Sequence, residues 1–304
     1  MIFILGWPKC GTSSLFNWLN AHPAIQGSIP KETFFLMDRG HPFYARHGRA
    51  FDQVGESGFE PFFDGPSMGR TRLEATTHHV FQDMARAAIS RLHPPPRVVF
   101  VLRDPADRIY SSYRWRLNNI SAINPLLTFN EYVNALLSNN IKFLEPHFRS
   151  EISLWIAQRE LVLGDYYYWI RKWRNVLPAD RQHVILFEEL RENNQEKLGD
   201  LLSCLDVHSG EGRNDILPKA NQTNKIRFHS IQRAALRVNP LLPKGNVKKW
   251  LKQKYLTLQG RSAPAECNYE VGLRALRRHF CPTIISLKDH YDLDLRRWQD
   301  YDES

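Results

Sequence analysis

The chain opens on a short apolar run, which leads into a turn framed by two glycines and then into a polar stretch. The apolar run covers residues 1–5, the glycines are Gly6 and Gly11, and the polar stretch is residues 12–14. This order predicts a strand, a loop and the first turn of a helix. In such an arrangement the loop N–H groups and the positive end of the helix dipole face one point. The segment is therefore typical of a phosphate-binding turn.

The position of a lysine in this turn separates it from the loop of nucleotide hydrolases. Gly6 and Gly11 have the G-x-x-x-x-G spacing of a P-loop, in which Lys follows the second glycine directly and a magnesium-binding Ser or Thr comes next. Here Lys9 lies inside the loop, and Thr12 follows Gly11. The sequence keeps the phosphate cradle but moves the lysine.

Other segments predict further strands and helices. Residues 97–102 are β-branched or apolar with one exception, which predicts a buried strand of a parallel sheet. Asp104 and Pro105 come soon afterwards and suit the N-cap and the first position of a helix. Aromatic residues at helical spacing over 164–173 predict a helix that packs into the core, and residues 183–187 predict another strand. Residues 273–298 predict one or two amphipathic helices.

Two of these junctions resemble those of sulfotransferases that use 3′-phosphoadenosine 5′-phosphosulfate (PAPS). Residues 8–15 read Pro-Lys-Cys-Gly-Thr-Ser-Ser-Leu and match the family pattern P-K-x-G-T-[ST]-[ST]-L. The family pattern R-x-P-x-x-R-x-x-S is matched by Arg103, Pro105, Arg108 and Ser111. The resemblance implies an α/β, P-loop-like fold of three layers, with a central parallel sheet flanked by helices. We expect a single sulfotransferase domain over residues 1–304.

The resemblance also implies a donor site. Its members are Lys9, Cys10, Gly11, Thr12, Ser13 and Ser14 at the 5′-phosphosulfate, and Arg103 and Ser111 at the 3′-phosphate. Because a sulfuryl group carries less charge than a phosphoryl group, Lys9 and the backbone N–H groups would take the place of magnesium, and no metal is expected. Arg108 also belongs to the second family motif, but an ordinary surface charge on the helix is an equally simple interpretation of this residue.

The acceptor side is less sharply defined. Lys31-Glu32-Thr33-Phe34-Phe35 resembles the K-E-x-x-F-F segment of glycan sulfotransferases, which implies Glu32 as the base and Lys31 as a second cation. An exposed loop ion pair is the alternative for these two residues, and His78 or His79 is the rival base. Residues 74–77 read Glu-Ala-Thr-Thr where the family has E-K-[ST]-P. The acceptor therefore stays open among a polysaccharide, a smaller sugar and a natural-product hydroxyl or amine.

Composition and charge limit the other function classes. The chain has 304 residues, a formal net charge of +9 and a pI of about 9.4, which suits anionic ligands without choosing among them. No helix-turn-helix, zinc or RNA-binding signature accompanies this charge, so nucleic acid is not an expected partner. A P-loop nucleotide kinase needs a lysine directly after the second glycine, whereas Thr12 follows Gly11 in this chain, so a kinase is the less favoured alternative. A non-catalytic nucleotide- or glycan-binding protein remains the other alternative.

The sequence also bears on location and on metal binding. No apolar stretch is long enough to span a membrane, and no signal peptide precedes the first strand, so we expect a cytoplasmic enzyme similar to bacterial members of the family. The cysteines and histidines have no zinc-site spacing, and a Cys267–Cys281 disulfide is not favoured. The basic stretch 244–254 is interpreted as a solvated helix face, with a place on the acceptor side as the alternative. The oligomeric state is not predicted.

Overall fold

The computed structural model describes residues 1–192, 195–207, 232–235, 269–291 and 293–298. The chain divides into two compact units. The first comprises Met1–Asp104, Asp165–Asn221 and Thr283–Gln299, and the second comprises Pro105–Gly164, Gln222–Pro282 and Asp300–Ser304. The basic stretch 244–254 and Cys267 lie outside the described residues. A single domain over the whole chain stays a prediction.

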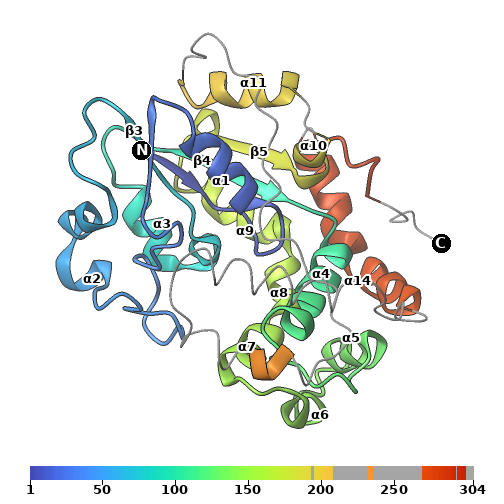
Figure 1. Cartoon of the computed structure of the whole chain (residues 1–304). Coiled ribbons are helices and arrows are strands. Elements are labelled where there is room, and N and C mark those ends of the chain that lie inside the picture. Colours follow the sequence, from blue (N-terminus) through green and yellow to red (C-terminus); the bar gives the residue numbers. More distant parts are fainter. Residues whose placement is uncertain (193–194, 208–231, 236–268, 292, 299–304) are drawn as a thin grey trace. The chain divides into compact units, whose positions relative to one another are not determined.

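The first unit is built around a five-stranded sheet in which every pair of neighbouring strands is parallel (Figure 1). The strands are β1 Ile2–Ile4, β2 Ile25–Gly27, β3 Thr71–Glu74, β4 Arg97–Leu102 and β5 Gln182–Leu186. The helices are α1 Thr12–Asn20, α2 Phe51–Val54, α3 Asp83–Ile89, α9 Tyr166–Arg174, α10 Phe187–Arg191 and α11 Gln195–Cys204, with 3₁₀ turns at Glu56–Phe62, Thr77–Phe81 and Ala179–Arg181. The predicted α/β fold with a central parallel sheet is confirmed.

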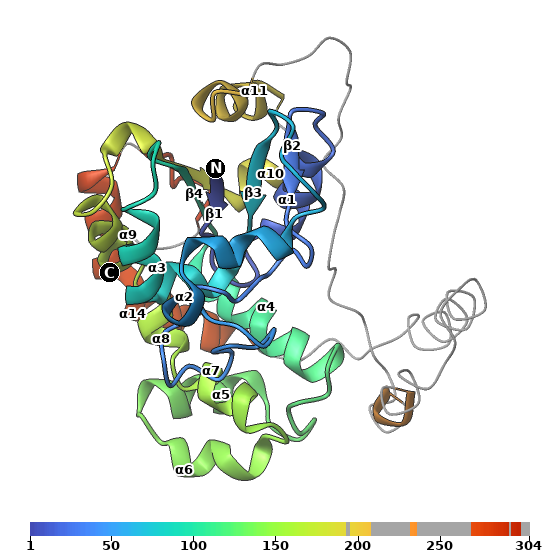
Figure 2. The same ribbon diagram turned by 90° about the vertical axis from the view of Figure 1, so that its left-hand side faces the viewer.

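The strand order explains why this unit has three layers. In the order β2-β3-β1-β4-β5, the chain leaves β1 toward β2 in one direction, and it leaves β3 toward β4 in the other. Because crossovers between parallel strands are right-handed, the connecting helices of these two steps belong on opposite faces of the sheet. Figure 2 shows this arrangement, with α1 on one side of the strands and α3 on the other. The direction of the connections reverses around β1, and ligands of such sheets bind at the carboxyl ends of the strands near the reversal.

The core of this unit is formed by the two central strands and by the aromatic helix. Residues Ile2–Ile4 and Val98–Leu102 are completely buried. Of the aromatic residues in α9, Tyr166, Trp169 and Trp173 are buried, which confirms their predicted place in the core. Trp7, just after β1, packs edge-on against Tyr166, with ring centroids 4.7 Å apart. The chain that follows β1 is therefore anchored to the core by a large ring.

The second unit is helical in its described part. It contains α4 Pro105–Asn118, α5 Phe129–Leu137, α6 Ile141–Leu144, α7 Glu151–Ala157, α8 Glu160–Gly164, a 3₁₀ turn at Glu145–His147 and the first part of α14 Glu270–His290. The sequence of α5 fixes its start, because the Thr128 hydroxyl accepts from the N–H of Glu131 while the Glu131 carboxylate accepts from the N–H of Thr128. The predicted helical segment 273–298 is one helix that ends at His290.

A buried ion-pair triad joins α4 to α8 in this unit. Arg108 Nη1 donates to Glu160 Oε2 over 2.6 Å, and Arg116 Nη2 donates to Glu160 Oε1 over 2.7 Å. All three side chains are at most 4% exposed. Burial alone would raise the pKa of Glu160, but the two guanidinium groups lower it below its usual range. The interpretation of Arg108 as a surface charge is wrong, because its charge is needed inside the helical unit.

Replacing Glu160 with Gln tests this triad. Because the change leaves two guanidinium groups buried without their counter-charge, we expect the free energy of unfolding to fall by about 3–5 kcal/mol. Guanidinium chloride denaturation measures the loss. Arg296→Ala is the control, since Arg296 and Asp294 form an exposed pair whose removal should change stability little. An unfolding midpoint of Glu160→Gln equal to that of the unmodified protein would contradict the account.

Candidate active site

The loop after β1 has a backbone shape that two glycines permit. Gly11 has φ +85°, a left-handed conformation that glycine adopts without steric cost. A Cβ at Gly11 would lie 2.7 Å from the ring of Phe187, and a Cβ at Gly6 would lie 2.3 Å from Thr12 Cγ2 and 2.9 Å from Val101 Cβ. Neither position has room for a side chain. The two glycines of the motif are therefore required by packing at both ends of the loop.

The loop leads directly into the first turn of α1. Gly11 is the N-cap residue, and its carbonyl accepts from the N–H of Ser14 over 2.9 Å and from that of Leu15 over 3.2 Å. No acidic residue lies in the first turn of the helix. The positive end of the helix dipole is thus not offset by a carboxylate of its own first turn, which favours binding of an anion there.

The predicted loop residues differ in how they are exposed. Lys9, Ser13 and Ser14 are half-buried, whereas Cys10 and Thr12 are buried. Lys9 has φ +73°, so the backbone reverses at this residue. The N–H of Cys10 donates to the carbonyl of Trp7 over 3.2 Å, which closes the turn. The buried side chain of Cys10 suits a part in shaping the loop.

Arg103, at the end of β4, lies against this loop. Its Nη1 donates to the carbonyl of Lys9 over 3.3 Å, and its guanidinium carbon lies 4.8 Å from the ring centroid of Phe187. The carbonyl of Arg103 accepts from the hydroxyl of Tyr166 over 2.8 Å. Phe187 thus contacts both the second glycine of the loop and the arginine. Lys9 and Arg103, which are 94 residues apart in the chain, thus bring the two sequence motifs together at the carboxyl ends of β1 and β4.

Ser111 is the predicted donor-site residue that lies in the second unit. It is half-buried on α4, three residues after the buried Arg108. Its part in donor binding stays a prediction, and so does the pairing of Ser111 with Arg103.

Lys31 and Glu32 are joined to the same loop. Lys31 Nζ donates to Ala75 O over 2.9 Å, lies 3.3 Å from Glu32 Oε1 and lies 3.4 Å from Thr12 Oγ1. The hydroxyl of Thr77 donates to the same Glu32 oxygen over 3.2 Å. The side chains of Lys31 and Glu32 are 19% and 34% exposed, so both are sheltered yet reachable. This pair is held by three other residues, unlike an isolated ion pair on an exposed loop.

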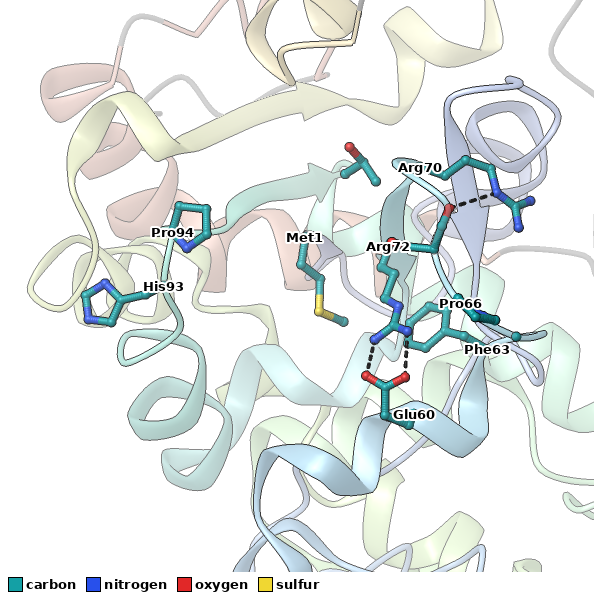
Figure 3. A pocket seen from close by; sticks show the side chains of 11 residues that line it. Met1, Glu60, Phe63, Pro66, Arg70, Arg72, His93 and Pro94 are labelled. Carbon is teal, nitrogen blue, oxygen red and sulfur yellow. Dashed lines mark hydrogen bonds and ion pairs between the residues drawn. The ribbon is translucent and has the colours of Figure 1, made fainter.

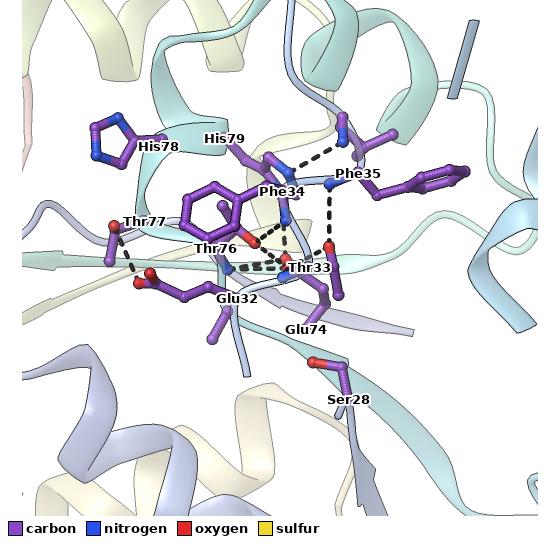
Figure 4. A network of polar contacts seen from close by, with 12 residues as sticks. Ser28, Glu32, Thr33, Phe34, Phe35, Glu74, Thr76, Thr77, His78 and His79 are labelled. Atoms are coloured by element: carbon purple, nitrogen blue, oxygen red, sulfur yellow. Dashed lines mark hydrogen bonds and ion pairs between the residues drawn. The ribbon is translucent and has the colours of Figure 1, made fainter. Parts of the chain in front are cut away.

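The two histidines lie in a different environment from Glu32. His79 is completely buried, where its Nδ1 lies 3.2 Å from Glu74 Oε2 and its Nε2 accepts from the N–H of Leu36 over 3.2 Å (Figure 4). His78 is 7% exposed, and its ring lies among those of His41 and Phe43. Both ring nitrogens of His79 face protein groups. This geometry favours Glu32 over His79 as the group that meets an acceptor.

Three of the residues at this site carry no clear signal in the sequence. Phe187 supports Gly11 and Arg103, Thr77 holds Glu32, and Glu74 is the centre of a buried polar network. Glu74 and Thr77 belong to the segment that departs from the family pattern. The departure at residues 74–77 is the sequence signal that indicates the acceptor side, but it assigns no role to Glu74 or Thr77.

A cleft of about 910 Å³ lies at the opposite edge of the sheet, near the amino ends of β1 and β3 (Figure 3). Its lining includes Met1, Arg70 and His93. Arg72, also in the lining, is held by Glu60 through two hydrogen bonds of 2.5 and 2.7 Å. This cleft is separate from the loop after β1 and contains none of the predicted site residues. Within the described part of the chain, no three His, Cys, Asp or Glu side chains gather as a metal site would require.

Comparisons with known proteins agree with this geometry. The family described as Sulfotransferase domain matches residues 1–263. The bifunctional heparan sulfate N-deacetylase/N-sulfotransferase 2 of Bos taurus is 24% identical over 229 residues, which cover 74% of this chain and 23% of that protein. The bifunctional heparan sulfate N-deacetylase/N-sulfotransferase 1 of Homo sapiens is 25% identical over 206 residues, which cover 66% of this chain and 21% of that protein. The chain thus matches less than a quarter of the length of these relatives.

A solved structure shares the fold over nearly the whole chain. The sulfotransferase from Alicyclobacillus acidocaldarius superposes with a TM-score of 0.58 at 19% sequence identity and covers 98% of both chains. Among the described helices, none combines the length and apolar character needed to cross a bilayer.

Replacing Gly11 with Ala tests the fit of the loop. The added methyl group would sit on a residue in the left-handed conformation and press on Phe187, so we expect a loss of stability of about 1–2 kcal/mol or more. We also expect at least a tenfold weaker binding of 3′,5′-ADP, the product that PAPS would leave after sulfuryl transfer. Calorimetric titration measures the binding. Gly69→Ala is the matched control, because Gly69 has φ +82° and no atom within 4 Å of its added Cβ. Equal binding by both variants would contradict the assignment of the loop.

Proposed function

The chain belongs to the sulfotransferase family, whose domain matches residues 1–263; we propose that it is a PAPS-dependent sulfotransferase, that the loop from Gly6 to Ser14 holds the donor and that Glu32 activates the acceptor. The observation that carries this assignment is the contact of Lys31 with both Thr12 and Glu32. It connects the phosphate cradle to a carboxylate through one cation. Donor and acceptor groups would therefore meet at the start of α1.

The donor is held by groups that suit its charges. The loop and the first turn of α1, with Thr12, Ser13 and Ser14, supply backbone and hydroxyl donors to the 5′-phosphosulfate. Arg103, together with Ser111, is assigned to the 3′-phosphate, since a planar guanidinium offers two parallel donors to a phosphate. The glycines support this assignment, because a Cβ at Gly6 or Gly11 would collide with neighbouring protein atoms and change the shape of the loop.

Lys9 is assigned to the leaving phosphate. In an in-line transfer the acceptor oxygen or nitrogen forms a bond to sulfur while the bond from sulfur to the bridging phosphate oxygen breaks, and negative charge builds on that oxygen. A cation directed at the bridging oxygen stabilises this charge more in the transition state than in the bound donor. Lys9 comes from inside the loop, between the glycines that shape the cradle. Lys31 adds a second positive charge beside Thr12.

Glu32 is assigned as the base. Its carboxylate is sheltered but reachable, and Lys31 and Thr77 fix its Oε1. Oε2 then remains for the proton of the acceptor hydroxyl or amine, which would leave as the new bond to sulfur forms. The proton, the new bond and the departing 3′,5′-ADP balance without any further reactant.

The acceptor is proposed to be a carbohydrate or a small molecule with a ring. The rings of Phe34 and Phe43 lie 4.8 Å apart close to Glu32 in the chain, and the guanidinium of Arg46 lies 5.0 and 4.7 Å from their centroids. The exposed Arg46 beside the half-buried ring of Phe43 suits a sugar or aromatic ring that carries an acidic group. The N-sulfotransferase relatives favour an amine on a glycan as the first acceptor to test.

Substitution of the two reactive groups tests this function. We expect Glu32→Gln and Lys9→Ala each to lower turnover by about 100-fold or more, since one removes the base and the other the charge on the leaving group. Glu32→Gln should bind 3′,5′-ADP as tightly as the unmodified protein, because Glu32 faces the acceptor. Transfer of labelled sulfate from PAPS and calorimetric titration provide the two readouts. Full activity of Glu32→Gln would refute its role as the base.

A further inference from the structure

The segment that carries Glu32 is held in an unusual way. Residues Thr33 to Leu36 form no helix or strand, yet each of their four backbone N–H groups donates to a side chain. The acceptors are Glu74 Oε1 at 3.3 Å, Thr76 Oγ1 at 3.1 Å, Thr33 Oγ1 at 3.3 Å and His79 Nε2 at 3.2 Å, in chain order. Since buried N–H groups must be paired, these side chains take the part that a neighbouring strand would otherwise play.

Glu74 lies at the centre of this arrangement. Its carboxylate is fully buried at the end of β3 and accepts from the hydroxyl and N–H of Thr33, from the hydroxyl and N–H of Thr76, and from His79 (Figure 4). Burial alone would raise the pKa of Glu74, but the hydrogen bonds from His79 and Thr76 lower it below its usual range. A buried carboxylate with this many donors is tightly fixed in place.

The hydrogen bonds also determine which ring nitrogen of His79 carries the proton. The N–H of Leu36 can only donate, so Nε2 of His79 must be the unprotonated nitrogen. The proton of the neutral ring then resides on Nδ1 and is donated to Glu74 Oε2. Glu74, His79 and the backbone of Leu36 form a directed chain in which each donor has one acceptor. Replacing either side chain breaks the chain at the segment that follows Glu32.

We propose that Glu74 and His79 are positioning residues for the transfer reaction, and that they fix the backbone of Thr33–Leu36 so that the Glu32 carboxylate stays beside Lys31, the residue that contacts Thr12. The proposal rests on the proposed role of Glu32 as the base. Neither Glu74 nor His79 touches the substrates; both act through the segment they bind. Lys31, on the other side of Glu32, is tied to the same turn through the carbonyl of Ala75. The base is thus held from both sides by the chain that follows β3.

Glu74→Gln provides the first test. Because an error of about 1 Å in the position of a catalytic group can cost about 100-fold in rate, we expect kcat to fall about 10- to 100-fold. The affinity for 3′,5′-ADP, measured by calorimetry, should stay unchanged because the donor loop is not part of the network. Full kcat in a folded Glu74→Gln variant would overturn the proposal.

A double-substitution cycle separates positioning from general weakening of the fold. If Glu74 acts through Glu32, the cost of Glu74→Gln should nearly vanish when Glu32→Gln is already present, which slow transfer over long incubations can measure. The same fold-loss of rate in both backgrounds would overturn the proposal. Full activity of Glu32→Gln alone would instead refute the proposed base, so the two failures are distinguishable.

A pair of variants at His79 keeps the test valid if Glu74→Gln does not fold. Gln can still accept from the Leu36 N–H, whereas Leu cannot, so His79→Gln should keep a higher kcat than His79→Leu at equal folded fraction. Equal kcat values would overturn the proposal. Gln182→Met is the control for lost buried hydrogen bonds, since Gln182 is buried in β5 and donates to Leu177 O over 2.7 Å. It should lower thermal stability and leave kcat unchanged.

Discussion

The close approach of the backbone at Gly6 and Gly11 is the constraint on which the site depends. Because neither glycine carries a Cβ, the chain can turn tightly between β1 and α1 where a side chain would clash, and the start of the helix faces the carboxyl edge of the sheet. The same lack of space brings Phe187 against Gly11, and the ring then supports Arg103. A steric condition at two glycines thereby determines where the proposed phosphate-binding loop and Arg103 lie.

The two halves of the site are built on different physical principles. The donor half uses main-chain groups of a strand, a loop and a helix, whose geometry follows from the fold itself. The acceptor half uses a segment without regular structure, and buried side chains around Glu74 hold it in place. Backbone geometry recurs wherever the fold does, whereas a side-chain network can change with a few substitutions. This difference agrees with a sequence that matches its family at the donor loop and departs from it at residues 74–77.

Much of the fold was predictable from local patterns. The β-branched run at 97–102 became β4 with unchanged bounds, and the aromatic stripe became the buried face of α9. The sequence also identified Lys31 and Glu32, and the contact of Lys31 with Thr12 follows from the fold. It could not assign Arg108, because the counter-charge Glu160 lies 52 residues away and no local pattern links the two. For the same reason the roles of Glu74 and His79 were not predictable: a buried carboxylate is identified by its partners, and these come from several segments.

The most direct test of the account is a calorimetric titration of the protein with 3′,5′-ADP in the absence of metal, beside a titration with ATP and magnesium. The account predicts tight binding of 3′,5′-ADP that needs no metal and is lost in Arg103→Ala, with weak binding of ATP. Binding of ATP that requires magnesium and is indifferent to a 3′-phosphate would contradict it, because a site of that kind belongs to a nucleotide kinase.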